Sequence, residues 1–352
     1  MKVPENMHID DLDYDLPDSL IATRPVEPRD SARLMVVHCG SGTIEHRHVS
    51  DLPTYLRSDD TIVRNRSRVL PARFRGHRVE SGGVVSGLFL KEHSEGCWLV
   101  MLKSNGRLRE GVVIQLEHSG PTLELIERRE SHWIVRPHSD ESAQQILSSC
   151  GLTPLPPYIL RARGDDDIPD EYDRERYQTI YAREPGSVAA PTAGLHFTDS
   201  LEKTLRAEGV SFLDVILHVG PGTFAPVMTD TLDDHPMHEE WCSIDGGTLS
   251  RLTSPDRTGR IVSIGTTTAR VLESLPEHHA DGDWSGLTDL LISPPFNWRF
   301  VDVLLTNFHL PRSTLLALVA ARTGIELMHR AYREAVDREY RFYSYGDAML
   351  VI

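Results

Sequence analysis

The chain has 352 residues, 39% of them hydrophobic, and a formal net charge of −15. This length and composition predict a folded protein of two domains and exclude a disordered or fibrous chain. The N-terminal stretch 1–17 is acidic and lacks an apolar core, which argues against a secretory signal, and the apolar run 315–321 is too short to span a bilayer. The four cysteines are scattered without a CxxC pair, which indicates reduced thiols. We therefore expect a cytoplasmic protein with no membrane partner.

The acidic net charge argues against a nucleic-acid partner, because affinity for phosphates depends on Lys and Arg. One segment differs from this average: residues 61–80 contain six arginines and one acid. The segment is either the solvated face of a β-rich region or a phosphate-binding patch. The use of Arg and not Lys favours phosphate slightly, since a guanidinium can bind two oxygens at once.

Short strands separated by close turns fill the chain from about residue 61 to 137, after an N-terminal region with one apolar strand at 34–38. Glycine-containing turns divide them, a spacing typical of small antiparallel barrels and sandwiches. The expected strands are 84–91, 97–102, 112–117, 122–127 and 132–135.

Strands and helices alternate after the Pro156-Pro157 pair. Such alternation requires crossover connections and predicts a largely parallel sheet. Asp199 is expected to cap the first helix, with Glu202 completing a capping box. The expected strands are 211–218, 260–264, 301–306 and 346–352, and the expected helices are 199–208, 266–275, 313–323 and 325–338.

The N-terminal sixty residues could belong to the same α/β body, in which case the β domain is inserted into it. The expected fold class is therefore α/β, a larger α/β domain with an inserted small antiparallel β-barrel domain. The expected boundaries are 1–60 and 151–352 for the discontinuous α/β catalytic domain, and 61–150 for the barrel.

Two segments place a histidine among small and hydroxylated residues where a strand meets a helix, Pro191–Phe197 and Thr306–Thr314. Open α/β sheets bind ligands at such junctions, where backbone N–H groups are unpaired. The run Gly265-Thr-Thr-Thr-Ala-Arg270 adds hydroxyls that could cap a helix and face a ligand. The turn in His218-Val-Gly-Pro-Gly-Thr-Phe224 either brings backbone close to a ligand or is a plain turn. It lacks the third glycine of a dinucleotide or methyltransferase fingerprint.

The cluster Asp233-Asp-His-Pro-Met-His-Glu-Glu240 has two histidines three residues apart among carboxylates. It could bind a metal, perform acid–base chemistry near neutral pH, or lie exposed on a loop. The HExxH order of zinc hydrolases is absent and Pro236 disfavours a helix, so acid–base chemistry or hydrogen bonding to a substrate is favoured over a metal. No GxSxG elbow is present, which argues against a nucleophilic hydrolase.

Taken together, these stretches resemble one family, the S-adenosylmethionine:tRNA ribosyltransferase-isomerases of queuosine biosynthesis. The resemblance runs from end to end, and the motifs keep the same order. Beyond the segments above it rests on Asp13-Tyr-Asp-Leu-Pro17, Ile21-Ala-Thr-Arg-Pro25, Glu27-Pro-Arg-Asp30, Arg68-Val-Leu-Pro-Ala-Arg73, Leu155-Pro-Pro-Tyr-Ile159, Glu175-Arg-Tyr-Gln-Thr-Ile-Tyr181 and Tyr345-Gly-Asp-Ala-Met-Leu350.

The resemblance implies a transferase that uses S-adenosylmethionine as a ribosyl donor and tRNA as its partner. It would transfer and isomerise the ribosyl moiety onto the aminomethyl-deazaguanine at the tRNA wobble position, giving epoxyqueuosine and releasing adenine and methionine. A carbon next to the sulfonium must lose a proton and adenine must gain one. Several acid–base groups should therefore converge on a mostly uncharged pocket. We expect no metal and a monomer.

The motifs and the resemblance together nominate the site residues as hypotheses. The acid–base candidates are His196, His218, His238 and His309, with Glu240 as a supporting carboxylate. The residues expected to hold S-adenosylmethionine are Gly194, Gly220, Gly222, Thr223, Gly265, Thr266, Thr267, Thr306 and Asn307. The arginines expected to contact tRNA are Arg24, Arg29, Arg33, Arg68 and Arg73.

Three stretches depart from the family pattern, 65–68, 103–107 and 293–296, and the first matters most, since Asn65-Arg-Ser-Arg68 stands where the family usually reads Asn-Asp-Thr-Arg. Arg66 and Ser67 thus replace Asp and Thr. The change favours an alternative function, either a paralogue on the same scaffold with a different acceptor, or a non-catalytic protein that binds tRNA or S-adenosylmethionine. A methyltransferase is disfavoured by the missing glycine fingerprint.

Overall fold

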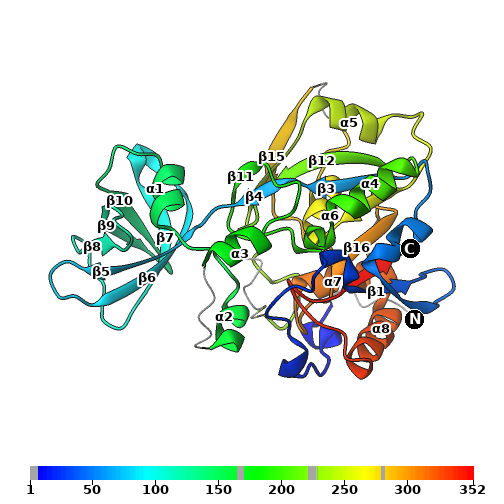
Figure 1. Cartoon of the computed structure of the whole chain (residues 1–352), viewed down its shortest axis with the longest axis horizontal. Coiled ribbons are helices and arrows are strands. Elements are labelled where there is room, and N and C mark those ends of the chain that lie inside the picture. Colours follow the sequence, from blue (N-terminus) through cyan, green and yellow to red (C-terminus); the bar gives the residue numbers. More distant parts are fainter. Residues whose placement is uncertain (1–6, 165–169, 221–226, 228, 279–281) are drawn as a thin grey trace. The chain divides into compact units, whose positions relative to one another are not determined.

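The computed structural model describes two compact units of the chain (Figure 1). The first unit holds Met1–Ser67, Thr179–Arg183 and Pro191–Ile352, and the second holds Arg68–Gln178 and Glu184–Ala190. The second unit is thus inserted into the first, as expected. None of the described helices is long and apolar enough to cross a membrane. The described residues are 7–164, 170–220, 227, 229–278 and 282–352.

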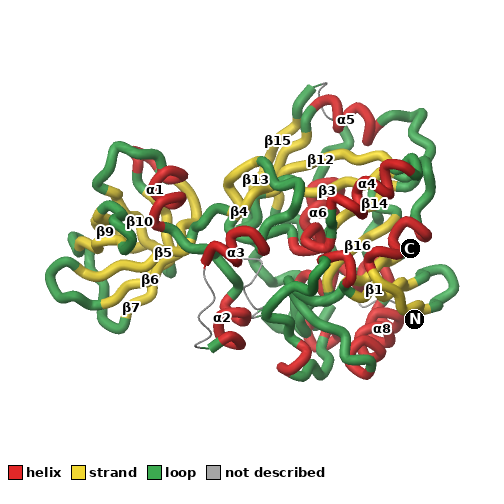
Figure 2. Tube along the Cα trace, viewed as in Figure 1, coloured by secondary structure: helices red, strands yellow, loops and turns green. Residues whose placement is uncertain are grey.

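A nine-stranded mixed sheet forms the centre of the first unit, in the order β15-β13-β12-β3-β14-β16-β17-β1-β2. Figure 2 shows β12, β3 and β14 side by side. The neighbours β12, β3, β14 and β16 are parallel, whereas the flanking strands β13 and β17 are antiparallel to them. Carboxyl ends of four strands and amino ends of two therefore share one edge. The strands are β1 (Arg33–Val37), β2 (Ile44–His48), β3 (Thr61–Asn65), β12 (Ser211–Leu217), β13 (Glu240–Ile244), β14 (Ile261–Ile264), β15 (Trp284–Thr288), β16 (Val303–Asn307) and β17 (Ala348–Val351).

Helices pack on the sheet because its central strands are apolar on both faces. Ile62, Ile264 and Leu305 point to one face, where they join Leu201 and Leu205 of α4 in the main core. α6 packs against β12 and β14, and all its residues are buried. The helices are α4 (Asp199–Ala207), α5 (Gly246–Thr253), α6 (Thr266–Glu273), α7 (Thr314–Thr323) and α8 (Ile325–Asp337). Shorter 3-10 helices are η1 (Ile9–Leu12), η2 (Asp18–Leu20), η3 (Arg29–Ser31), η4 (Val49–Tyr55) and η6 (Thr192–His196).

The second unit is a closed antiparallel barrel of six strands, in the order β10-β7-β6-β5-β8-β9. Phe74 fills its interior beside Gly87, where the ring leaves no room for a Cβ. Ile146 and Leu147 of α1 extend this core. Its elements are β5 (Arg73–Arg78), β6 (Val84–Glu92), η5 (Ser94–Gly96), β7 (Trp98–Ser104), β8 (Val113–Leu116), β9 (Thr122–Arg129), β10 (His132–Pro137), α1 (Ala143–Cys150), α2 (Pro157–Arg163) and α3 (Asp170–Arg176), and β4 (Ser67–Val69) pairs with β11 (Glu184–Ser187).

The structure differs from the sequence-based expectations at several places, and β5, β13 and β15 are strands that the sequence did not predict. The expected boundary at residue 60 excludes β3, which pairs with β12 and β14 inside the large sheet, and α2 and α3 group with the barrel unit. The expected cap at Asp199 is wrong. Thr198 caps α4, since its hydroxyl accepts a hydrogen bond from the Leu201 N–H at 3.1 Å, and Glu202 instead pairs with Arg64.

Replacing Thr198 by Ala should lower the free energy of unfolding by about 1 kcal/mol, because the capping oxygen of α4 is lost. Asp199→Ala is the matched control and should cost less, since it keeps the cap. Urea denaturation followed by circular dichroism measures both. A larger loss for Asp199→Ala would contradict the assignment of the cap.

Candidate active site

The nominated residues gather at the edge where the parallel strands end. His218 follows β12, Gly265 follows β14, and His309 comes two residues after β16. Glu240 begins β13, which runs antiparallel to β12, so it lies at the same edge. In open α/β sheets this edge is where ligands bind. The fold therefore brings together segments that are far apart in the sequence.

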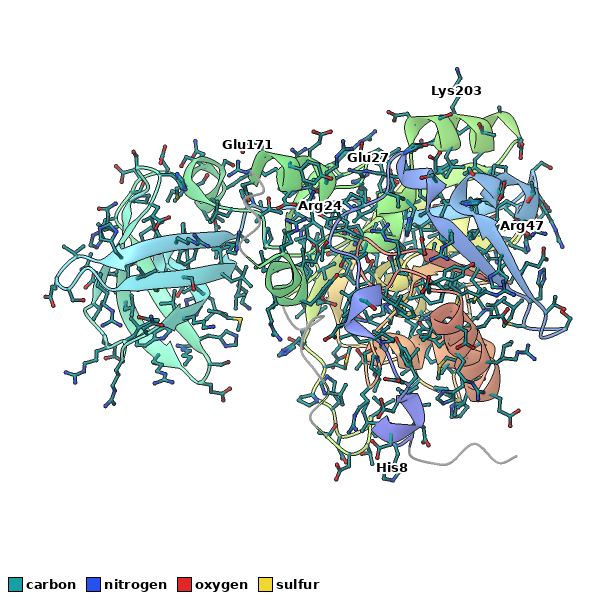
Figure 3. All side chains as sticks on the ribbon, turned by 60° about the horizontal axis from the view of Figure 1, so that its bottom comes forward. His8, Arg24, Glu27, Arg47, Glu171 and Lys203 are labelled. Atoms are coloured by element: carbon teal, nitrogen blue, oxygen red, sulfur yellow. The ribbon has the colours of Figure 1, made fainter. Side chains whose placement is uncertain are left out.

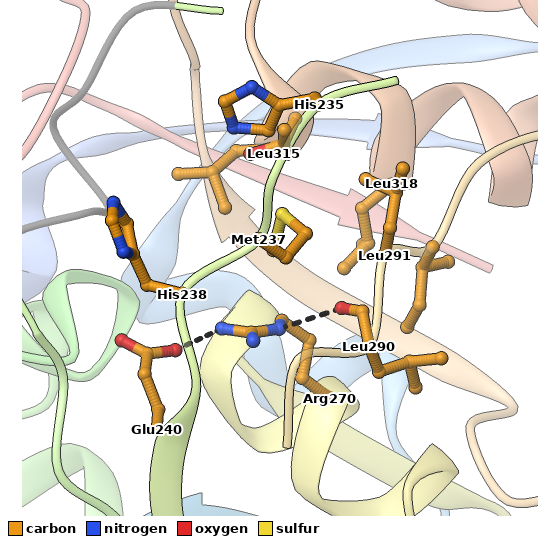
Figure 4. A pocket seen from close by; sticks show the side chains of 11 residues that line it. His235, Met237, His238, Glu240, Arg270, Leu290, Leu291, Leu315 and Leu318 are labelled. Atoms are coloured by element: carbon orange, nitrogen blue, oxygen red, sulfur yellow. Dashed lines mark hydrogen bonds and ion pairs between the residues drawn. The ribbon is translucent and has the colours of Figure 1, made fainter. Parts of the chain in front are cut away.

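A pocket at this edge has an empty volume of about 500 Å³, part of it open to solvent (Figure 4). Its apolar wall comes from the loop after β15 and from the first turns of α7. Its mixed lining offers an apolar wall with polar groups at the rim, the combination that ligand pockets use to bind and orient a small molecule. The polar lining is His235, His238, Glu240, Arg270 and Thr314, and the apolar lining is Met237, Leu290, Leu291, Ile292, Leu315 and Leu318.

A buried ion pair between Glu240 and Arg270 forms one side of the pocket. The Arg270 guanidinium also donates to the Leu290 carbonyl at 3.0 Å, as the dashed lines in Figure 4 show. The other carboxylate oxygen of Glu240 accepts the Gly220 N–H at 2.7 Å. With both oxygens engaged, Glu240 holds the turn after β12 in place and presents no free negative charge to a ligand.

Two histidines of the Asp233–Glu240 segment line the pocket. His238 is exposed and His235 is half-buried. Burial lowers the pKa of His235, and the neighbouring His238 lowers it further. Two imidazoles from this one segment thus stand at the pocket, and imidazole is the side chain most often used for general acid–base chemistry.

His309 is buried, at 8% exposed. Its Nε2 lies 2.8 Å from Thr306 Oγ1, its backbone N–H donates to the Tyr332 hydroxyl at 3.1 Å, and its carbonyl accepts from Tyr14. Burial lowers the pKa of the ring to about 3. The ring is therefore neutral at physiological pH and acts as a hydrogen-bonding group.

His196 of η6 contacts Asn307, whose Nδ2 lies 3.1 Å from the His196 Nε2. Burial is the main cause that lowers the pKa of His196 to about 4. The ring also lines a second, smaller pocket together with Arg29 and Tyr345. Two residues nominated from separate motifs are thus in direct contact.

His218 lies outside both pockets. Its ring is half-buried and stacks on Trp241, with centroids 5.0 Å apart and planes 21° apart. The structure therefore places each of the four histidine candidates in a different local environment.

Two of the nominated glycines, Gly194 and Gly265, have steric roles. A Cβ on Gly194 would collide with the Tyr181 hydroxyl, and Gly265 has a φ of +88° where β14 turns into α6. Thr266 and Thr267 are buried residues of α6 itself. The hydroxyls do not cap that helix, because its N-cap is Gly265. Gly222 and Thr223 lie outside the described residues.

The five nominated arginines lie in both units, Arg24, Arg29 and Arg33 in the first and Arg68 and Arg73 in the second. Arg24 and Arg68 are exposed, and Figure 3 labels Arg24. Burial lowers the pKa of Arg73. Arg33 pairs with Asp347 at 2.9 Å and lies over the Tyr340 ring, so it is engaged within the fold. A tRNA role for these residues stays a prediction.

Sequence reasoning missed Arg270 and His235 as site residues. A signal for Arg270 was present, because it lies four residues after Thr266 on one helix and so shares its face. No group of three or more His, Cys, Asp or Glu among the described residues is arranged to hold a metal ion.

Replacing Arg270 by Met should lower the free energy of unfolding by about 3 to 5 kcal/mol, because a buried carboxylate is left uncompensated. Adding Glu240→Gln should recover part of that loss, since the buried charge is removed. Urea denaturation of the single and double variants measures this coupling. A double variant less stable than Arg270→Met would contradict the ion-pair assignment.

The two buried imidazoles should make stability depend on pH. In the unfolded chain they titrate near 6.5, whereas the folded pKa values are about 4 for His196 and about 3 for His309. Below about pH 6.5 the unfolded chain binds more protons, so stability should fall as pH drops towards 4, by up to about 1.4 kcal/mol per pH unit for each ring. His309→Gln should flatten this dependence in denaturant titrations. Parallel curves for the variant and the wild type would refute it.

Comparisons with known proteins show the family of the chain. The family model described as "Queuosine biosynthesis protein" matches residues 9–351. The S-adenosylmethionine:tRNA ribosyltransferase-isomerase of Thermotoga petrophila is 43% identical over 349 residues, which cover 98% of this chain and 100% of that protein. The protein of the same name from Carboxydothermus hydrogenoformans is 44% identical over 347 residues, with the same coverage.

A solved structure is similar as well. The crystal structure of S-adenosylmethionine tRNA ribosyltransferase from Thermotoga maritima is 34% identical, covers 97% of this chain and 100% of that chain, and has a TM-score of 0.56. Family model, relatives and structure match along nearly the whole length. The chain therefore belongs to the queuosine biosynthesis protein family.

Proposed function

We propose that this chain is an S-adenosylmethionine:tRNA ribosyltransferase-isomerase. It transfers and isomerises the ribosyl moiety of S-adenosylmethionine onto the aminomethyl-deazaguanine at the tRNA wobble position, giving epoxyqueuosine and releasing adenine and methionine. Full-length relatives that bear this name support the assignment.

The observation that carries the proposal is the pocket at the carboxyl edge of the parallel strands. Its leucines offer an apolar wall to a purine or deazapurine ring, and its imidazoles stand at the polar rim. Because Arg270 neutralises Glu240, the pocket holds no uncompensated charge on that pair. This matches the mostly uncharged site that we expect for proton transfer to adenine and from the carbon next to the sulfonium.

The reaction requires a proton to leave a carbon next to the sulfonium, an amine to attack, and adenine to be protonated as it departs. We assign proton transfer to His238, which is exposed at the pocket. His196 and His309 are neutral and buried, so we assign them to hydrogen bonding and to positioning Asn307 and Thr306. Glu240 positions the turn at Gly220. His218 remains a candidate through its place beside this turn.

We assign S-adenosylmethionine binding to nominated residues that lie at the same edge of the sheet. Gly194, Gly265, Thr266 and Thr267 surround the junction of β14 with α6. The exposed Arg24 and Arg68 are our first candidates for tRNA phosphates. We expect a cytoplasmic monomer that needs no metal.

Incubation with S-adenosylmethionine and a tRNA bearing the aminomethyl-deazaguanine should yield epoxyqueuosine, adenine and methionine, detected by mass spectrometry. His238→Asn should slow adenine release about 100-fold or more without changing the melting temperature, because a proton-transfer group is lost. S-adenosylhomocysteine as the product would instead show a methyltransferase.

Arg66 favours two alternative functions, and the same assay separates them. Binding of both substrates without turnover would support the non-catalytic binding protein. Turnover with another acceptor would support the paralogue.

A further inference from the structure

Three side chains form a row across neighbouring strands, at the edge of the sheet that carries the candidate active site. Leu287 lies on β15, Trp241 on β13, and His218 directly after β12. Trp241 is 40% exposed and Leu287 is 61% exposed, and the two residues are partners in the β13–β15 register. On the other side of Trp241, the His218 N–H donates to the Trp241 carbonyl at 2.9 Å and the rings stack. We call His218, Trp241 and Leu287 the stacking row.

Arg64 and Arg66 lie beside the stacking row, at the end of β3, the strand that pairs with β12. Side chains alternate along a strand, so Asp214 and His218 on β12 and its extension share a face. Arg64 of β3 pairs with Asp214 at 2.7 Å, which places Arg64 and, two residues on, Arg66 on that same face. The Arg183 N–H donates to the Arg66 carbonyl at 2.9 Å, and Arg183 is exposed.

A polar pocket with an empty volume of about 780 Å³ continues this face over the start of α4. Its cations are Arg64, Arg183, Lys203 and Arg206, and its acids are Asp199 and Glu202. Glu202 pairs with both Arg64 and Arg206. Among the described residues, Arg183 and Lys203 make no ion pair, and Figure 3 shows Lys203 projecting away from α4.

The stacking row and this polar pocket over α4 are close enough for one ligand to contact both. Asp214, beside the pocket, and His218, in the row, are four residues apart, or roughly 13 Å along the strand. A ligand that covers both needs a flat apolar group at one end and negative charges at the other. An unpaired nucleotide chain has this composition, because its bases stack on aromatic rings and its phosphates bind Arg and Lys.

We propose that this face binds a single-stranded segment of RNA, with an unpaired base on Trp241 and phosphates at Arg66, Arg183 and Lys203. The inference rests on the proposed function, in which the acceptor is a tRNA and its modified base lies in the single-stranded anticodon loop. It also gives a role to Arg66, the residue that departs from the family pattern. The side chain supplies a cation beside the row.

The test measures affinity for an anticodon stem-loop by fluorescence anisotropy over a series of salt concentrations. A blunt RNA duplex with the same number of phosphates is the second probe. Trp241→Ala should weaken stem-loop binding about tenfold or more and leave the salt slope unchanged, because stacking is uncharged. Trp241→Phe should lose less stem-loop affinity than Trp241→Ala, since it keeps an aromatic ring.

Arg66→Gln should reduce the salt slope, the dependence of log affinity on log salt concentration, by about 0.7.

Trp284→Ala is the matched control, since Trp284 lies at the other end of β15, opposite Ile244. It should bind as the wild type does, and duplex binding should be the same for the wild type and both Trp241 variants. Thermal melting confirms that each variant is folded.

Stem-loop binding by Trp241→Ala equal to that of the wild type would overturn the inference and leave the proposed function standing. An equal loss on the duplex would also overturn it, as would a loss of turnover at unchanged affinity, which would make Trp241 a positioning residue for His218. A wild type that binds no stem-loop would reject the inference together with the proposed function.

Discussion

Parallel pairing of β12, β3, β14 and β16 is the constraint on which the site depends. Parallel neighbours end at the same edge, so each strand delivers the residues that follow it to one region. His218, Gly265 and His309 reach that region in this way. The antiparallel β13 and β17 complete it from the opposite direction, since they begin where their neighbours end.

The buried polar side chains at this edge are either neutral or paired with an opposite charge. Arg270 compensates Glu240, and its other bonds go to the backbone carbonyls of Thr288, at the end of β15, and of Leu290, in the loop that follows. His196 and His309 are buried, which lowers both pKa values and keeps the rings neutral. Buried charges are costly unless paired, and the exposed His238 is the group that we propose to exchange protons with a substrate. The division of roles among the histidines follows from their burial.

The two faces of β13 serve different purposes because side chains alternate along a strand. Glu240 points inward to α6 and the pocket, whereas its neighbour Trp241 lies exposed beside His218. One strand end thus supports both the pocket proposed for chemistry and the surface proposed for RNA. Such adjacency suits a reaction whose acceptor is one base of a large substrate.

Local sequence patterns were sufficient to predict five of the six barrel strands, all except β5, together with the strand–helix alternation and the apolar helix α7, because periodicity and turn residues act over a few positions. They also pointed to the loops at the edge, where glycines and hydroxyls follow apolar strands. Only the tertiary structure decided that Thr198 caps α4, that β3 belongs to the large sheet, and that Arg270 pairs with Glu240. It also separated His218 from the pocket and buried His309. These outcomes depend on strand order and on burial, which arise from contacts between distant parts of the chain and leave no periodic signal in the sequence.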